Sequence, residues 1–479
     1  MPLEMHGADL EVPLVTGGSR RYVYLDTAAS APALSAVVEA VAEFLPWYSS
    51  VHRGTGFKSM VATAAYEGAR REVERFFGTR PDDVVVFTRN TTDALNLLAA
   101  SVPDNVRVVA FETEHHANLL PWRRRGATFL PAPRSPADAV ALVKAELRLG
   151  GPALLAVTGA SNVTGELWPV ADLVAVAHEH DARVVLDAAQ LAPHRGIDLT
   201  TLDVDYLAAS GHKLYAPFGV GVLIGRSDWL EAGEPFLVGG GAVRFVTTSE
   251  VVWGSLPDRQ EAGTPNVVGA VALGVACRVL REAGVDTLAA EEHALLKRMV
   301  SGLQGLPGLE LYSLWGSDHD RIGVVTFNLV GVDYAVTAAA LSAEYAVAVR
   351  HGCFCAHPLM LRLLGVEQSR ADSVRAAMRG GEPVMVPGAV RASLGFGSTI
   401  EDVDQFLAAM GCLCNGGPRW KYGALDGGKD AVPVPDPRLQ AGCPPFRTAV
   451  SAQIAPPFLV ASRAQPDRAR SDMVAVSDR

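Results

Sequence analysis

The sequence predicts an α/β protein in which a large domain is built on a mainly parallel sheet with helices on both faces. Strand-like apolar runs alternate with amphipathic helical patterns through much of the chain, which is typical of such sheets. The 479 residues, 49% of them hydrophobic, are enough for a large core and for a second domain. Polar residues follow several of the runs directly, where α/β proteins bind ligands.

The expected strands of the large domain alternate with helical segments in chain order. The strand-like runs are VVVF from Val84, VRVVAF from Val106, ALLAVT from Ala153, RVVLDAA from Arg183, DYLAAS from Asp205 and VGVLIG from Val220. Helical patterns lie in TTDALNLLAA, HHANLLPWRRR and VADLVAVAHEH. Because each helical segment returns the chain to the same end of the sheet, we expect neighbouring strands to be parallel.

A smaller α+β domain is predicted to follow. NVVGAVALGVACRVLREAG and EEHALLKRMVSGL are helical patterns, IGVVTFNLV, AVAVR and VRASLGF read as strands, and TIEDVDQFLAAMG reads as the last helix. We therefore divide the chain into an N-terminal segment (1–34), a large domain (35–260) and a small C-terminal domain (261–414). Residues 415–479 are rich in proline, glycine and charge, and predict a peripheral or partly disordered tail.

Composition argues against several classes of function. A net charge of −10 without a long basic stripe disfavours nucleic-acid binding. No run approaches the roughly 20 apolar residues that span a bilayer, and MPLEMHGADLEVPL lacks the basic and apolar regions of a signal peptide. Six cysteines in a chain of this length do not form a disulfide framework. We expect a cytoplasmic protein that binds neither membranes nor nucleic acids.

Residues with chemical functions follow four of the predicted strands. They are Thr91 and Thr92, then His115 and His116, then Asp187 and Gln190, and last Ser210, His212 and Lys213. Each could be structural when taken alone, as a helix cap or a buried polar group. A cofactor with an aldehyde, a phosphate and a pyridine ring needs an amine, a phosphate cradle, a carboxylate for the ring nitrogen and a flat group over the ring. The four sets together match these needs.

Several longer motifs support this interpretation. They are YLDTAASAP from Tyr24, HRG at His52, TRNTTDALNLL, TEHHANLLPW, SNVTGE at Ser161, VVLDAAQLAPH, ASGHKLYAPFGVGVLIG, EAGTPN at Glu261 and VRASLGF at Val390. In this order they resemble the class V aminotransferase family of fold-type I pyridoxal-phosphate enzymes, in particular its cysteine desulfurase and selenocysteine lyase branch. The resemblance covers Tyr24 to Gly411. It implies a seven-stranded sheet in the large domain, pyridoxal 5'-phosphate as cofactor and a homodimer.

The resemblance also implies roles for individual residues. Lys213 would form the Schiff base, Asp187 would hold the pyridinium proton, His116 would stack on the ring and Gln190 would contact the phenolic oxygen. The phosphate would be bound by Thr91, Thr92, Ser210 and His212, with Thr264 reaching across from the other subunit. Asn162 would contact the cofactor and would also bind the substrate carboxylate with Arg350 and Arg391, since an arginine fork matches a carboxylate.

The segment VRHGCFCAHPLM, Val349 to Met360, carries the predicted sulfur chemistry. In the desulfurase branch a cysteine at this place removes sulfur from the substrate, which leaves alanine and an enzyme persulfide; Cys355 fits that position. Positive charge from His351, His357 or Arg350 could lower the pKa of its thiol. Phe354 stands where the branch commonly has a histidine. The stretch between Pro358 and Arg391 is longer than the family leads us to expect, and could reshape the substrate entrance.

Three hypotheses follow, in order of preference. The first is a cysteine desulfurase or selenocysteine lyase that acts on a small amino acid, with a sulfur-acceptor protein as a possible partner. The second is another class V enzyme, such as an aminotransferase, epimerase or C–S lyase, with a different amino-acid substrate. The third is a metal-binding or sulfur-carrier scaffold, since His351, Cys353, Cys355 and His357 alternate and could share one face of a strand. Cys412 and Cys414 could join them as further ligands. Their spacing matches no usual zinc pattern, so we expect no metal.

Overall fold

The computed structural model describes residues 3–438, except 53, 317, 383 and 426–429. The large domain contains a seven-stranded sheet. In spatial order its strands are β4 (Asp83–Thr88), β10 (Gly221–Arg226), β9 (Tyr206–Ser210), β8 (Ala182–Asp187), β7 (Ala153–Thr158), β5 (Arg107–Phe111) and β6 (Thr128–Leu130). β10 runs antiparallel to both of its neighbours, and the remaining pairs are parallel. The predicted mainly parallel sheet is therefore confirmed.

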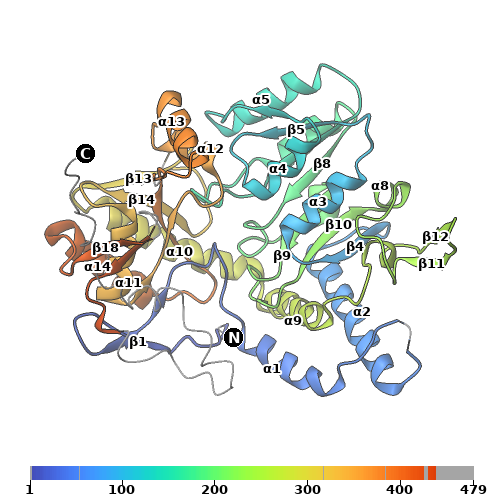
Figure 1. Cartoon of the computed structure of the whole chain (residues 1–479), viewed down its shortest axis with the longest axis horizontal. Coiled ribbons are helices and arrows are strands. Elements are labelled where there is room, and N and C mark those ends of the chain that lie inside the picture. The colour runs from blue at the N-terminus through green and yellow to red at the C-terminus, as the bar shows by residue number, and fades with distance from the viewer. Residues whose placement is uncertain (1–2, 53, 317, 383, 426–429, 439–479) are drawn as a thin grey trace, which may run out of the picture.

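Helices cover both faces of this sheet (Figure 1). On one face α3 (Thr91–Ser101), α4 (Leu120–Arg124) and α8 (Ser227–Ala232) bury a core that includes Leu98, Trp122 and Leu230. The other face packs against α2 (Phe57–Phe77), α5 (Pro136–Leu147), α6 (Val170–His178) and α9 (Val267–Ala283). α1 (Ser35–Phe44) lies against α9. Strands buried on both faces explain why the apolar runs in the sequence are nearly continuous.

A second core belongs to the small domain. Its antiparallel sheet has the order β13 (Leu309–Tyr312), β14 (Val324–Leu329), β17 (Ala389–Ser393) and β16 (Arg350–Gly352). The helices α10 (Val285–Gln304), α11 (Tyr334–Tyr345) and α14 (Ile400–Gly416) contribute to the same core. Near the N-terminus β1 (Glu11–Pro13) pairs with β2 (Ser19–Arg21), and β3 (Val23–Tyr24) pairs with β15 (Val347–Ala348). The N-terminal segment thus contacts both domains: Val23 and Leu25 lie in the core of the small one, and Met5 and Leu34 in that of the large one.

The packing of α9 bears on the division of the chain. The sequence-based boundary at residue 261 assigns this helix to the small domain, whereas its buried residues Leu273 and Cys277 lie in the core of the large one. The exact boundaries stay a prediction. The packing favours a division between α9 and α10.

The chain beyond α14 forms a hairpin of β18 (Tyr422–Leu425) and β19 (Asp430–Pro433), which packs on α11. Glu344 of α11 is buried and accepts hydrogen bonds from the main-chain N–H groups of Arg419 and Trp420 and from the hydroxyl of Tyr422. Asp430 of β19 lies 3.2 Å from His351. Part of the predicted tail is therefore folded, and residues 439–479 lie outside the described residues.

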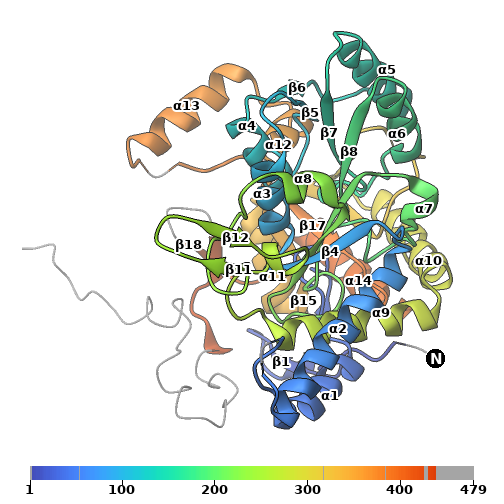
Figure 2. The same ribbon diagram turned by 90° about the vertical axis from the view of Figure 1, so that its right-hand side faces the viewer.

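The long stretch before Arg391 forms α12 (His357–Leu363) and α13 (Gln368–Arg379). α13 has no buried residue and projects from the body of the protein (Figure 2). Within this stretch α12 is packed, with Leu359 and Met360 buried, and α13 alone forms a projecting arm.

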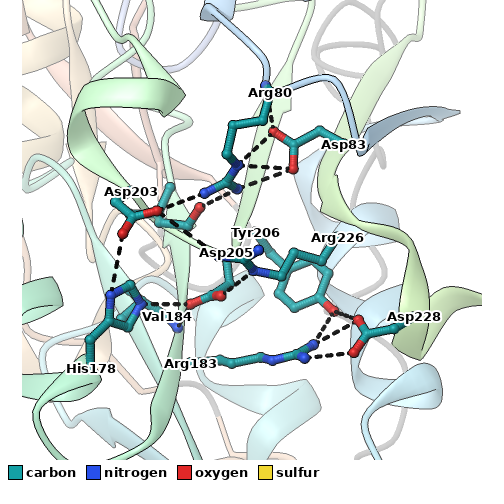
Figure 3. A network of polar contacts seen from close by, with 11 residues as sticks. Arg80, Asp83, His178, Arg183, Val184, Asp203, Asp205, Tyr206, Arg226 and Asp228 are labelled. Carbon is teal, nitrogen blue, oxygen red and sulfur yellow. Dashed lines mark hydrogen bonds and ion pairs between the residues drawn. The ribbon is translucent and has the colours of Figure 1, made fainter.

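A polar network ties the strands together at the sheet edge opposite their carboxyl ends (Figure 3). The buried carboxylate of Asp205 accepts hydrogen bonds from the amide of Val184 and from Arg226 Nε, and lies 3.1 Å from His178 Nε2. Arg80 bonds to Asp83 and Asp203 in the same network. These contacts link β4, β8, β9 and β10 away from the functional edge.

Among the described helices, none is long and apolar enough to cross a membrane.

Candidate active site

A cavity of about 270 Å³ lies at the carboxyl ends of the parallel strands, between the two domains. Most of the side chains predicted from the sequence line it: Thr91, Thr92, Asn162, Asp187, Gln190, Ser210, His212, Lys213, Arg350, Cys355 and Arg391. Residues separated by up to 300 positions are thus brought together by the two folded cores. His116 and Thr264 are not among the lining residues.

One end of the cavity is formed by the first turn of α3. The side chain of Asn90 caps the helix by accepting a hydrogen bond from the amide of Asp93, 3.0 Å away. Ser210 Oγ accepts a hydrogen bond from the amide of Thr91 at 2.8 Å and lies 2.7 Å from Thr91 Oγ1. A Cβ at Gly221 would lie 2.6 Å from Asn90 Cα, so only glycine lets β10 approach this turn. Hydroxyls at the positive end of a helix form a suitable site for an anion.

Lys213 lies in the turn after β9 and is buried. Burial lowers the pKa of its ammonium to about 8, against the opposing effect of Asp187, and Arg391 adds to the decrease. Asp187, at the end of β8, is itself buried, and burial raises the pKa of its carboxyl although the amide of Ala189 donates to Oδ1 at 3.0 Å. A buried amine that is partly neutral near pH 8 can act as a base or a nucleophile.

Gln190 offers a polar atom that no protein group uses. Its Nε2 donates to the main-chain oxygen of Ala28 at 2.7 Å, whereas Oε1 is buried without a partner in the described part of the protein. Unpaired buried polar atoms cost free energy and are uncommon in folded proteins. An unpaired amide oxygen in the lining of a cavity therefore indicates a site for a polar ligand.

Arg391 of β17 is almost fully buried at the opposite side of the site. Its Nη1 donates to the main-chain oxygen of Asn162 at 2.8 Å and its Nη2 to Asp26 Oδ1 at 3.3 Å, while Nε has no partner among the described residues. Arg350 lies 3.9 Å from Asp26 Oδ2. Asp26, which belongs to the YLDTAASAP motif and for which the sequence suggested no role, thus lies between the two arginines.

Cys355 lies on the loop after β16 and lines the cavity. Phe354 and Cys355 both have left-handed backbone conformations, with φ of 53° and 55°, which non-glycine residues adopt only when their surroundings impose it. Asn162 Nδ2 donates to the main-chain oxygen of Phe354 at 2.7 Å. The Phe354 ring packs 4.9 Å from the Arg391 guanidinium. Phe354 therefore contributes packing at the position where the branch commonly has a histidine.

Of the histidine pair after β5, His115 lines the cavity, whereas the sequence-based prediction chose His116. His115 is the last extended residue before a short 3-10 turn, η2 (His116–Asn118), so the two adjacent side chains diverge. His115 Nδ1 accepts a hydrogen bond from the amide of Ala117, and burial together with Lys213 lowers its pKa to about 3. The ring is neutral with its hydrogen on Nε2. A histidine doublet in a sequence does not show which ring faces the site.

Thr264 lies in a separate depression of about 170 Å³ with His52 and Glu261.

The four residues proposed as metal ligands, His351, Cys353, Cys355 and His357, do not share one face of a strand, because β16 ends at Gly352 and the left-handed residues follow. His351 contacts Asp430, and His357 contacts His116. Within the described residues, no three His, Cys, Asp or Glu side chains are grouped closely enough to hold a metal ion.

Burial lowers the pKa values of both His351 and His357, so these rings are neutral at pH 7. They therefore do not provide the positive charge expected near Cys355. Lys213 and Arg391 both interact electrostatically with the Cys355 thiol, and Arg350 is a third cation in the lining of the cavity.

Glu114 is a buried residue that interacts with Asp187 of the site and that the sequence analysis missed. It is fully buried; its Oε2 accepts from Asn118 at 2.7 Å and its Oε1 from the amide of Thr158 at 3.1 Å. Trp122 Nε1 in turn donates to Asn118 Oδ1. Burial raises the pKa of Glu114 to about 8, and the charge of Asp187 contributes to the increase. The sequence did offer a signal for Glu114, because this residue follows a predicted strand and directly precedes the two histidines.

Comparisons with known proteins agree with this geometry. Residues 23–406 match the aminotransferase class-V family. A cysteine desulfurase of Klebsiella pneumoniae (strain 342) is 37% identical over 399 residues, which are 81% of this chain and 92% of that protein. A cysteine desulfurase of Escherichia coli (strain SE11) is 35% identical over the same coverage.

Two solved structures extend the comparison to three dimensions. The apo cysteine desulfurase of Thermococcus onnurineus NA1 superposes with a TM-score of 0.72 at 32% identity, covering 82% of this chain and 95% of that one. A cysteine desulfurase of Escherichia coli in an S-sulfonic acid form gives a TM-score of 0.68, also at 32% identity, covering 81% and 93%. The chain belongs to the aminotransferase class-V family, in which these relatives are cysteine desulfurases.

Proposed function

We propose that the protein is a pyridoxal-phosphate-dependent desulfurase, which removes sulfur from L-cysteine, or selenium from selenocysteine, and leaves alanine. The observation that carries the proposal is a single cavity that combines a buried lysine, a buried carboxylate, an anion-binding helix terminus and an accessible thiol. The family and its cysteine desulfurase relatives support the same reaction.

The residues present fit the cofactor. The hydroxyls of Thr91, Thr92 and Ser210 with His212 would hold the phosphate at the start of α3. Asp187 would hold the proton of the pyridine nitrogen, and the unpaired Gln190 Oε1 marks a place for a polar group of the ring. His115 replaces His116 as the residue we expect to lie against the ring. When bound, pyridoxal phosphate supplies an aldehyde that condenses with amines and a ring that withdraws electrons.

The protein's own residues divide the remaining tasks. Lys213, with its lowered pKa, takes a proton from the substrate and returns one. Arg391, with Asn162 and Arg350 nearby, binds the substrate carboxylate, and Asp26 orients the arginine. Cys355 Sγ forms the new S–S bond while the carbon–sulfur bond of the substrate breaks. L-Cysteine and one thiol thus give L-alanine and the persulfide of Cys355.

We also propose a homodimer. The hairpin of β11 (Val243–Val246) and β12 (Val251–Trp253) projects from the large domain and exposes Phe245, Val246 and Val252 by more than half (Figure 1). Exposed apolar groups of this size are typical of interfaces. Thr264 lies outside the cavity of its own chain, which supports a role at the partner's phosphate site. Sedimentation velocity of the wild type and of Phe245→Asp tests the dimer, which the variant should weaken.

Two further parts of the proposal concern the cell. A sulfur-acceptor protein would take the persulfide sulfur from Cys355, which is exposed; a thiol reductant replaces this protein in an assay. The cytoplasmic location stays a prediction from the sequence.

The test is the absorbance spectrum of the purified protein, followed by assays of alanine and sulfide after addition of L-cysteine and a thiol reductant. We compare the wild type with Cys355→Ala and with Cys353→Ala, which removes a thiol two residues away. A yellow protein that forms both products unless Cys355 is replaced supports the proposal. A yellow protein indifferent to cysteine would indicate another amino-acid substrate, and turnover by Lys213→Ala would contradict the proposal altogether.

A further inference from the structure

The loop that carries Cys355 is held by the large domain, although it follows a strand of the small one. The amide of His116 donates to the main-chain oxygen of Cys355 at 2.8 Å, and Asn162 bonds to the main-chain oxygen of Phe354. Since the backbone of both loop residues is left-handed, these contacts must offset its strain. His116, which does not line the cavity, therefore lies where it can fix the loop.

His116 in turn contacts His357, the first residue of α12. The two imidazole rings are nearly parallel, with centroids 5.0 Å apart and an interplanar angle of 9°. His357 Nδ1 lies 3.2 Å from His116 Nε2, and the main-chain N–H of His357 donates to the same nitrogen at 3.4 Å. Because this N–H can only donate, His116 Nε2 is the acceptor and His357 Nδ1 carries a hydrogen.

The charge states agree with this arrangement. Burial lowers the pKa of both rings, and for His116 the neighbouring His357 adds to the effect. Two neutral rings can share an N–H···N hydrogen bond, whereas a protonated His116 would have no lone pair to accept it. The pair therefore contributes hydrogen bonds and stacking to the site, without a positive charge.

We propose that His357 is a positioning residue for Cys355: together with His116 it forms a two-histidine clasp that holds the cysteine loop against the cavity. The chain of contacts runs from His357 Nδ1 to His116 Nε2, and from the His116 amide to the Cys355 carbonyl. His116 thus contacts the cysteine loop at two places, at the main-chain oxygen of Cys355 and at His357, two residues further along the chain. The kinetic part of this proposal rests on the proposed desulfurase function, whereas the structural part does not.

The test compares His357→Ala, His357→Gln and the wild type, each loaded with cofactor. Glutamine keeps an N–H that can reach His116, and alanine does not. His319→Ala is the matched control, because His319 also makes one side-chain hydrogen bond and one ring contact, to Leu167 and Trp315, away from the cavity. Hydrogen–deuterium exchange of the segment 351–362 reports on the loop, and kcat and KM for L-cysteine report on chemistry.

We expect His357→Ala to speed exchange in this segment severalfold and to lower kcat about tenfold, with KM changed less than twofold. His357→Gln should restore both quantities to within about threefold of the wild type, and His319→Ala should leave both unchanged. If exchange and kcat are unaffected by His357→Ala, or if glutamine fails to restore them, the clasp is wrong. If the wild type does not release sulfide from cysteine, the proposed function fails while exchange in the three variants still decides for or against the clasp.

Discussion

Replacing Lys213 by methionine should stabilise the cofactor-free protein. The ordinary pKa of a lysine is 10.5, and burial lowers that of Lys213 to about 8. Since each tenfold change in proton affinity corresponds to about 1.4 kcal/mol, keeping the ammonium in the folded state costs about 3 kcal/mol at neutral pH. Methionine has a similar length and no charge, so it removes this cost. The attraction to Asp187 is already included in this pKa, so we expect a gain of about 3 kcal/mol.

The sign of the pH dependence follows from the same pKa values. Below pH 8 the amine is protonated in both the folded and the unfolded state, and the full cost is present. Between pH 8 and 10.5 the unfolded chain binds more protons, so the stability of the wild type rises with pH. The advantage of Lys213→Met should therefore shrink as the pH is raised from 7 to 10.

Urea denaturation of the cofactor-free protein, followed by circular dichroism at both pH values, measures the difference. Lys144→Met is the control, since the Lys144 side chain is 39% exposed. Its contact with Glu179 is an ion pair at the surface, and the loss of this pair should change stability by less than about 1 kcal/mol. A wild type as stable as Lys213→Met at pH 7, or an advantage that does not depend on pH, would refute the assignment of a buried, destabilised ammonium.

Three other variants test the surroundings of the site. Ser210→Ala removes the hydroxyl that accepts from the Thr91 amide and should weaken cofactor binding about tenfold in equilibrium dialysis, since a hydrogen bond to a charged group is worth about 1.5–3 kcal/mol; Ser101→Ala, at the other end of α3, should not. Glu114→Gln removes a carboxyl that interacts with Asp187 and should shift the pH dependence of the cofactor absorbance to lower pH. Glu112→Gln keeps an oxygen that can accept from the amide of Ala132 and should leave the curve in place; coincident curves for Glu114→Gln and the wild type would contradict the coupling. Asp205→Asn breaks the network in Figure 3 and should lower the free energy of unfolding by about 3 kcal/mol with an unchanged cofactor spectrum; a thermal melt like that of the wild type would show that the network adds little.

Most of the large sheet could be predicted because its strands are buried on both faces and are continuous apolar runs. β6 was not predicted, since it is a short edge strand followed closely by two prolines, Pro131 and Pro133, which argue against a strand. The residues at strand ends were identified for the same reason that they meet in space: parallel strands bring their carboxyl ends to one edge.

The differences between the predicted and the observed site have three separate causes. Which of His115 and His116 faces the cavity depends on the backbone of the short turn that begins at His116. The two residues are adjacent and of the same type, so the sequence alone does not distinguish them. The expected positive charge of His351 and His357 was wrong because burial of a ring depends on packing between distant segments. The left-handed backbone at Phe354 and Cys355 could not be predicted, because neither residue type favours it and the contacts that stabilise it come from distant residues, among them Asn162 and His116.

The hairpin of β18 and β19 cannot be treated as separate from the small domain, because it packs on α11. The match to the family ends at residue 406, within α14, yet three of the donors to the buried carboxylate of Glu344 come from residues 419–422. A chain cut after α14 would leave that carboxylate with fewer partners and would remove Asp430 from His351, three residues before Phe354. The hairpin that follows the region matched by the family thus supports the strand that leads into the cysteine loop. The hairpin and the catalytic part of the chain therefore have to be inherited, exchanged or expressed together.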